Sequence, residues 1–137
     1  MAANLKRVVL DTNIFISDIL NGGKPREVVE LIYSEQIKGV ISPAILTELQ
    51  ETLIKKFKFL KEAVLDIEKE IEESFELVYP KLTIAILEDN PDNRVLEAAI
   101  EGKCYFIVTG DNDLLRLKEY KRIKIITPHQ FLYAIKI

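Results

Sequence analysis

Short apolar runs alternate with longer stretches of helical periodicity along almost the whole chain, and no other feature limits the fold as strongly. The runs that predict strands are KRVVLD (6–11), GVIS (39–42), CYFIVT (104–109) and RIKIIT (122–127), with LTIAIL (82–87) as a short edge strand. Helical spacing or helix punctuation marks residues 13–20, 26–35, 43–57, 59–78, 88–102, 111–117 and 128–135. Strands that alternate with helices and are apolar enough to be covered on both faces indicate a central parallel sheet.

This alternation predicts a three-layer α/β/α domain with a parallel sheet of about four to five strands. The chain of 137 residues is 48% hydrophobic, which is enough for one ordinary core, and neither a repeat nor a Gly/Ser linker divides it. We therefore expect a single domain over residues 1–137.

Two aspartates follow the ends of predicted strands. Asp11 closes the first strand, and Asp111 comes shortly after CYFIV. Because ligands of open α/β sheets bind at the carboxyl ends of the strands, both acids are expected at the same edge of the sheet. Each could instead cap the helix that follows it, since Asp is common at helix N-termini.

Two further acids lie on predicted helices. Glu48 borders the apolar stripe of helix 43–57, whereas Glu51 points away from that stripe and is expected to be solvated. A carboxylate at the edge of a buried face needs a partner, and no Lys or Arg lies one turn away from Glu48. Asp92 follows Asn90-Pro91 at a helix start, where an acid is also favoured by the helix dipole.

Composition removes several classes of chemistry. The single histidine, His129, has no partner in sequence, which disfavours histidine catalysis and a zinc site. The single cysteine, Cys104, permits no internal disulfide and is expected to be packed. The sequence shows neither a membrane span nor a signal peptide, so we expect a cytoplasmic protein without a membrane partner.

If Asp11, Glu48, Asp92 and Asp111 converge, their charges repel, and the cluster either takes up protons or binds cations. Carboxylate oxygens without histidine or thiol neighbours select Mg²⁺ or Mn²⁺. Such a cation activates water and stabilises the oxygens of a phosphodiester. Convergence of these acids would therefore suit metal-dependent hydrolysis of phosphodiesters, whereas four separate helix caps would not.

Five fragments in order, VVLDTNIFIS, SPAILTEL, DNPDNRVLEAA, YFIVTGDNDLL and IITPHQFL, resemble the PIN-domain nucleases, particularly the small toxins of toxin–antitoxin pairs. The resemblance places the family's four acids on Asp11, Glu48, Asp92 and Asp111. It also implies supporting roles for Asn13, Thr109 and Asp113. The implied activity is divalent-metal-dependent endoribonuclease cleavage of RNA that leaves a 5′-phosphate, and the implied partners are an antitoxin and further copies of the chain.

Two other functions stay open from the sequence. The same fold could serve as a noncatalytic RNA- or protein-binding domain, although the complete set of acids favours catalysis. An aspartyl-phosphate phosphatase is disfavoured, because such enzymes of the haloacid dehalogenase type have a second Asp two positions after the nucleophile, where this chain has Asn13.

Lysines and aromatic residues mark two candidate RNA contacts. KKFKFLK places Lys55, Lys56, Lys58 and Lys61 around two phenylalanines, a pattern typical of single-strand binding, although the rings could belong to the core. RLKEYKRIK (116–124) is a weaker candidate, because charges beside an edge strand also prevent aggregation.

Overall fold

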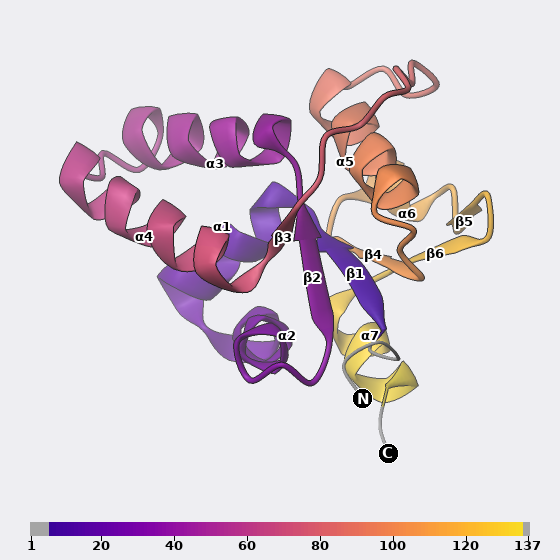
Figure 1. Ribbon diagram of the computed structural model, residues 1–137, viewed down its shortest axis with the longest axis horizontal. Helices are drawn as coiled ribbons and strands as arrows, with labels where there is room; N and C mark the ends of the chain where they lie inside the picture. The colour runs from indigo at the N-terminus through magenta and orange to yellow at the C-terminus, as the bar shows by residue number, and fades with distance from the viewer. Residues whose placement is uncertain (1–5, 136–137) are drawn as a thin grey trace.

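The computed structural model describes residues 6–135 and has a six-stranded sheet at its centre (Figure 1). The strand order is β3-β2-β1-β4-β6-β5, with four parallel pairings and an antiparallel pairing between β5 and β6. The strands are β1 (Arg7–Leu10), β2 (Lys38–Ile41), β3 (Glu76–Leu77), β4 (Phe106–Val108), β5 (Glu119–Tyr120) and β6 (Ile123–Ile126). The predicted parallel sheet is confirmed, with one short antiparallel strand added at its edge.

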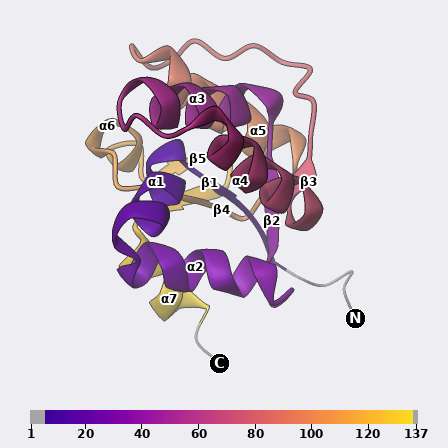
Figure 2. The same ribbon diagram turned by 90° about the vertical axis from the view of Figure 1, so that its left-hand side faces the viewer.

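Helices cover both faces of this sheet (Figures 1 and 2). They are α1 (Thr12–Asn21), α2 (Gly23–Tyr33), α3 (Pro43–Lys55), α4 (Lys61–Ser74), α5 (Asn90–Glu101), α6 (Asn112–Leu115) and α7 (Pro128–Ala134). α5 packs against β1, β2 and β4, whereas α1 packs against β1 and α2, and α2 in turn packs against α7. The predicted three layers are therefore confirmed.

The two central strands, β1 and β4, bring the first and last predicted acids together. Val8, Val9 and Leu10 are fully buried, as expected for a strand covered on both faces. Leu10 pairs with Val108, and the backbone N–H of Asp11 donates to the carbonyl of Val108 at 3.0 Å. The residues after the two strands thus leave the sheet side by side.

The edge strand β3 lies where the sequence predicted the end of the helix over residues 59–78. α4 stops at Ser74, and Glu76–Leu77 pairs with β2, while the predicted strand LTIAIL (82–87) is irregular. The helix ends there because buried Phe75 packs over Gly39 of β2, where any β-carbon would lie 2.6 Å from its ring. The amide of Val78 then donates to Ile41, which continues the extended chain.

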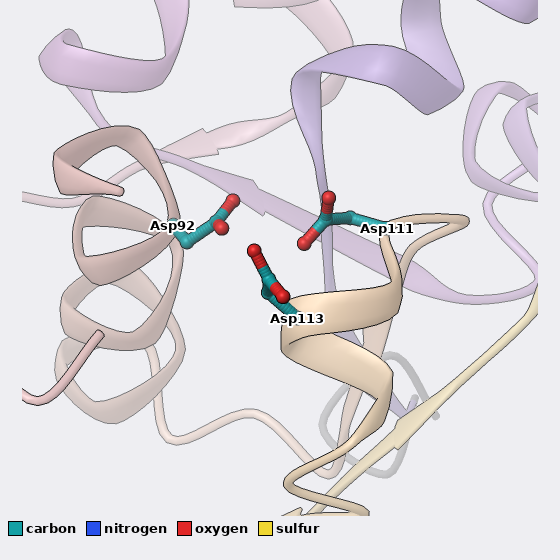
Figure 3. A group of neighbouring side chains, drawn as sticks. All are labelled: Asp92, Asp111 and Asp113. Carbon is teal, nitrogen blue, oxygen red and sulfur yellow. The ribbon is translucent and has the colours of Figure 1, made fainter. Parts of the chain in front are cut away.

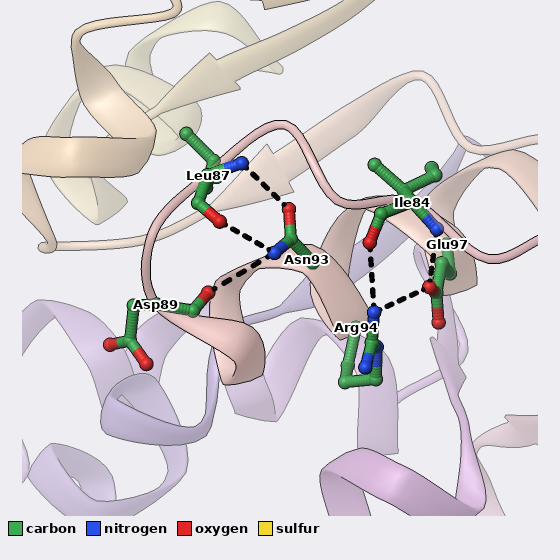
Figure 4. Close-up of polar contacts among 6 residues, drawn as sticks. All are labelled: Ile84, Leu87, Asp89, Asn93, Arg94 and Glu97. Atoms are coloured by element: carbon green, nitrogen blue, oxygen red, sulfur yellow. Dashed lines mark hydrogen bonds and ion pairs between the residues drawn. The ribbon is translucent and has the colours of Figure 1, made fainter.

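Side chains of α5, rather than a neighbouring strand, bind the polar backbone groups of the irregular segment (Figure 4). The Asn93 side chain accepts from the Leu87 amide at 3.0 Å and donates to the Leu87 carbonyl at 2.8 Å. Glu97 accepts from the Ile84 amide at 2.7 Å and pairs with Arg94, which donates to the Ile84 carbonyl. These contacts hold the chain that leads into the start of α5.

Smaller expectations can be checked directly. Ser42 caps α3, and Thr127 caps α7 in a reciprocal arrangement with Gln130. Cys104 is buried and His129 is exposed. In the part of the chain that the structure describes, no helix combines the length and apolar character needed to cross a membrane.

Candidate metal centre

Asp11 is a buried acid whose carboxylate does not cap the helix that it precedes. It occupies the N-cap position of α1, yet its side chain forms no capping hydrogen bond. Instead, its Oδ2 accepts a hydrogen bond from the Thr109 hydroxyl at 2.8 Å. Because Asp11 is only 5% exposed and is not used as a cap, its burial calls for another explanation.

Thr109 connects Asp11 with Asp111. The fully buried hydroxyl that donates to Asp11 also accepts from the backbone N–H of Asp111 at 2.9 Å. The Oδ2 atom of Asp111 accepts from the Leu114 amide at 3.1 Å and so caps α6. Asp111 is therefore both a cap and a neighbour of the buried acid, so the two interpretations of this residue are compatible.

Three carboxylates point toward one another between the start of α5 and the start of α6 (Figure 3). One oxygen from each of Asp92, Asp111 and Asp113 lies within 4.8 Å of the other two. Asp92 is 5% exposed, and its Oδ2 is buried without a hydrogen-bond partner among residues 6–135. An unpaired buried carboxylate oxygen beside two other acids is what an oxygen-coordinated cation would satisfy.

The acids perturb one another's protonation. Burial raises the pKa of Asp92 to about 7, and the charges of Asp111, Asp89 and Asp11 act in the same direction. Burial also raises the pKa of Asp11 to about 6, helped by the charges of Glu48 and Asp111 and opposed by the Thr109 hydrogen bond. Such elevations are typical of acids gathered at functional sites.

The sequence matches the PIN domain family over residues 7–113. The chain belongs to the PIN domain family. A relative, the uncharacterized protein MJ1680 of Methanocaldococcus jannaschii, is 30% identical over 139 aligned positions, which cover 92% of this chain and 89% of the relative.

Solved structures with the same fold share much less sequence with this PIN domain. VapBC2 from Rickettsia felis, bound to a DNA fragment from its promoter, has a TM-score of 0.60 at 19% identity, over 87% of this chain and 96% of that one. The PIN domain endonuclease Utp24 has a TM-score of 0.56 at 18% identity, over 87% and 82% of the two chains. PAE2754 from Pyrobaculum aerophilum has a TM-score of 0.61 at 15% identity, over 95% and 88%.

Within this PIN domain the predicted acids do not all stand in one group. Asp92 and Asp111 belong to the trio, together with Asp113, which the sequence ranked as accessory. Asp113 also pairs with Arg116 at 2.6 Å. Asp11 and Glu48 lie outside the trio. The charge of Asp11 nevertheless raises the pKa of Asp92, and the charge of Glu48 raises the pKa of Asp11.

Glu48 and Asn13 occupy the margins of the site. Glu48 is half-buried on α3 and lines a pocket of about 430 Å³, and Arg94 of α5 also lines this pocket. Glu51 lines the same pocket but is exposed and pairs with Lys55 at 3.2 Å. Asn13 is exposed and its side chain forms no hydrogen bond within residues 6–135, so its predicted support of Asp11 stays a prediction.

The lysine cluster predicted to contact RNA lies at the end of α3 and the start of α4. Lys55, Lys56, Lys58 and Lys61 are all exposed. The rings of Phe57 and Phe59 are partly buried against the core, which leaves less of them for base stacking. RNA contact by these lysines stays a prediction.

Sequence reasoning missed the residues that fix the position of Asp92. Asn93, Arg94 and Glu97 follow it on α5 and hold residues 84–89 in place, as described above. One signal was available, because Glu97 shares a helical face with Asn93 and Arg94 within an otherwise apolar segment. Polar residues on such a face are expected to bind buried backbone groups.

Proposed function

We propose that this PIN domain is a divalent-metal-dependent endoribonuclease that hydrolyses RNA phosphodiester bonds. The observation that carries the proposal is the convergence of Asp92, Asp111 and Asp113, with one buried Asp92 oxygen that has no hydrogen-bond partner in the described part of the chain. The all-oxygen donor set favours Mg²⁺ or Mn²⁺ over zinc or copper. Membership of the PIN domain family and the likeness to the endonuclease Utp24 support the same activity.

The residues of the trio fit such a cation, and Asp92 and Asp111 would hold it with Asp113. When bound, the cation would supply Lewis-acid activation of water and stabilise charge on the phosphate. Asp11 and Glu48 would add two further carboxylates beside the trio, as the sequence resemblance implies, and we call these five acids the acidic wall. The Thr109 hydroxyl orients the Asp11 carboxylate and positions the Asp111 backbone, which fixes the two acids relative to each other.

We further propose that the protein acts in the cytoplasm as the toxin of a toxin–antitoxin system. The support is the small single PIN domain and its likeness in fold to VapBC2. An antitoxin protein and further copies of this chain would then be its partners, in addition to the RNA substrate.

The proposed activity is tested by incubating the protein with structured and unstructured RNAs in the presence of Mg²⁺, Mn²⁺ or a chelator. We expect cleavage only with metal, and none by the Asp11→Asn variant. Equal cutting in excess chelator would refute the mechanism. RNA binding without any cleavage under all these conditions would instead indicate a noncatalytic binding domain.

Glu48 and Glu51 offer a test of how far the acidic wall extends. Glu48→Gln should lower the cleavage rate at least about tenfold, because its charge faces Asp11 and completes the negative site. Glu51→Gln, one turn further along α3 and paired with Lys55 at the surface, should change the rate less than about twofold. Initial rates on one labelled RNA measure both, and equal losses would show that the pair acts through general surface charge.

A further inference from the structure

A second candidate site lies at the end of the sheet opposite the acids. A pocket of about 340 Å³ is formed by the end of α5, the residues before β4 and the turn between β5 and β6. Tyr105 lines this pocket directly before β4, whereas Thr109 and Asp111 follow β4 at its other end. We call it the distal pocket.

Among the residues that the structure describes, cations and no acids line the distal pocket. Lys103, Lys121 and Arg122 contribute to its wall, and its remaining lining residues are uncharged. None of these three side chains forms an ion pair within residues 6–135. Since the whole chain carries a formal charge of −3, this local excess of positive charge would attract an anionic ligand to one place on the surface.

The three cations of the distal pocket have a positive φ, a backbone conformation that Gly and Asn adopt more easily than Lys or Arg. Lys121 and Arg122 form the two-residue turn between β5 and β6 with φ values of 48° and 71°, and Lys103 has a φ of 51°. Two-residue hairpin turns with positive φ at both positions strongly prefer Asn-Gly. Turn geometry therefore does not explain why Lys and Arg occupy these positions.

An aromatic ring completes the distal pocket. Tyr105 is 56% exposed, and the Lys6 ammonium lies 4.8 Å from the centroid of its ring. Cations that track phosphates beside a ring that can stack on a base are the combination used to bind single-stranded nucleic acids. An acidic peptide would use the same cations, but it has no repeated planar bases to stack on the tyrosine ring.

We propose that the distal pocket binds a single-stranded segment of RNA, with Lys103, Lys121 and Arg122 contacting phosphates and Tyr105 stacking on a base. The chemistry of the distal pocket suits a single-stranded nucleic acid. The choice of RNA among nucleic acids rests on the proposed function. The segment bound here lies outside the acidic cleavage site, so the distal pocket anchors substrate rather than reacting with it.

The test measures binding of a fluorescent oligouridine of about 12 nucleotides by anisotropy in the presence of chelator. The key variant is Lys121→Asn with Arg122→Gly, which removes two cations and installs the preferred turn, so the fold is kept. Tyr105→Leu removes the ring and Tyr105→Phe retains it. The charge-matched control is Lys24→Asn with Lys69→Asn, two exposed lysines on α2 and α4.

The turn variant should lower the slope of log affinity against log salt by about 1.4, that is about 0.7 for each lost phosphate contact. Tyr105→Leu should weaken binding about five- to a hundredfold, and Tyr105→Phe should not. An unchanged slope in the turn variant, or an equal drop in the lysine control, would overturn the proposal. So would an acidic peptide that depends on the turn while RNA does not.

Failure of this inference is distinguishable from failure of the proposed function. If the protein cleaves RNA with metal and the turn variant binds RNA as the parent does, only the distal-pocket proposal is refuted. Binding that depends on the turn and on Tyr105, combined with no cleavage under any condition, supports the distal pocket and refutes the nuclease.

Discussion

Replacing Asp92 with asparagine should reduce RNA cleavage at least about a hundredfold. The Asp92 carboxylate is buried beside Asp111 and Asp113, and one of its oxygens has no hydrogen-bond partner within the residues that the structure describes. An amide keeps the shape of the side chain but removes the negative charge that a divalent cation requires. Initial rates of cleavage of a labelled RNA with Mn²⁺ measure the effect.

The matched control for this change is Asp66→Asn, which makes the same chemical change at an exposed position of α4. Its rate should stay within about twofold of the parent, since an exposed acid far from the site contributes little to its field. If Asp92→Asn cleaved RNA as fast as Asp66→Asn, the acidic trio would not be the catalytic site.

The same substitution should make the metal-free protein more stable at neutral pH. The folded protein holds the pKa of Asp92 at about 7 and that of Asp11 at about 6, whereas both are near 3.8 in an unfolded chain. The folded state therefore binds more protons than the unfolded state between about pH 4 and pH 7, so the free energy of unfolding falls as the pH rises through this window. For Asp92 the full penalty above pH 7 is at most about 4 kcal/mol.

Asp92→Asn removes that penalty, so in chelator near pH 8 we expect it to raise the free energy of unfolding by about 1–3 kcal/mol. Near pH 4 the gain should disappear, because the carboxyl is then largely protonated in the folded state. Metal should offset this gain at pH 8, since the parent gains about 2.7 kcal/mol at a hundredfold excess over Kd and the variant gains less. Urea unfolding at both pH values, with chelator and with Mg²⁺, measures these terms.

Parallel behaviour of the two proteins would contradict this account. If Asp92 were only a favourable acid in the first turn of α5, its amide would be neutral or slightly destabilising at every pH above 4. Metal would then stabilise the parent and the variant equally. A gain in stability that is confined to high pH and reduced by metal is expected from a buried acid that lies among other acids and binds a cation.

The end of the sheet at which the candidate site lies was predictable from the sequence, because the evidence for it is in short segments of the chain. Asp11 and Asp111 each follow an apolar run, and parallel strands place such residues at one edge. Whether Asp11 is a cap could not be decided in this way, since capping depends on where the carboxylate points. The hydrogen bond from Thr109, 98 positions away in sequence, decides it.

The parts that the sequence did not predict depend on long-range packing. A strand of two residues such as Glu76–Leu77 has too short a pattern to recognise, and it forms because the edge of β2 accepts it. The apolar segment 82–87 has the composition of a strand, but side chains of α5 bind its backbone instead. Asp113 joins the trio because the short α6 turns it toward Asp92, an orientation that spacing alone does not give.

Binding of Mn²⁺ to the metal-free protein tests the central claim most directly. Free Mn²⁺ is followed by electron paramagnetic resonance during titration of the parent, Asp111→Asn and Asp66→Asn. Asparagine caps helices as well as aspartate does, so Asp111→Asn retains the start of α6 and removes only the charge. We predict that the parent and Asp66→Asn deplete free Mn²⁺ alike and that Asp111→Asn binds at least about tenfold more weakly. Equal binding by all three proteins would contradict a cation site formed by Asp92, Asp111 and Asp113.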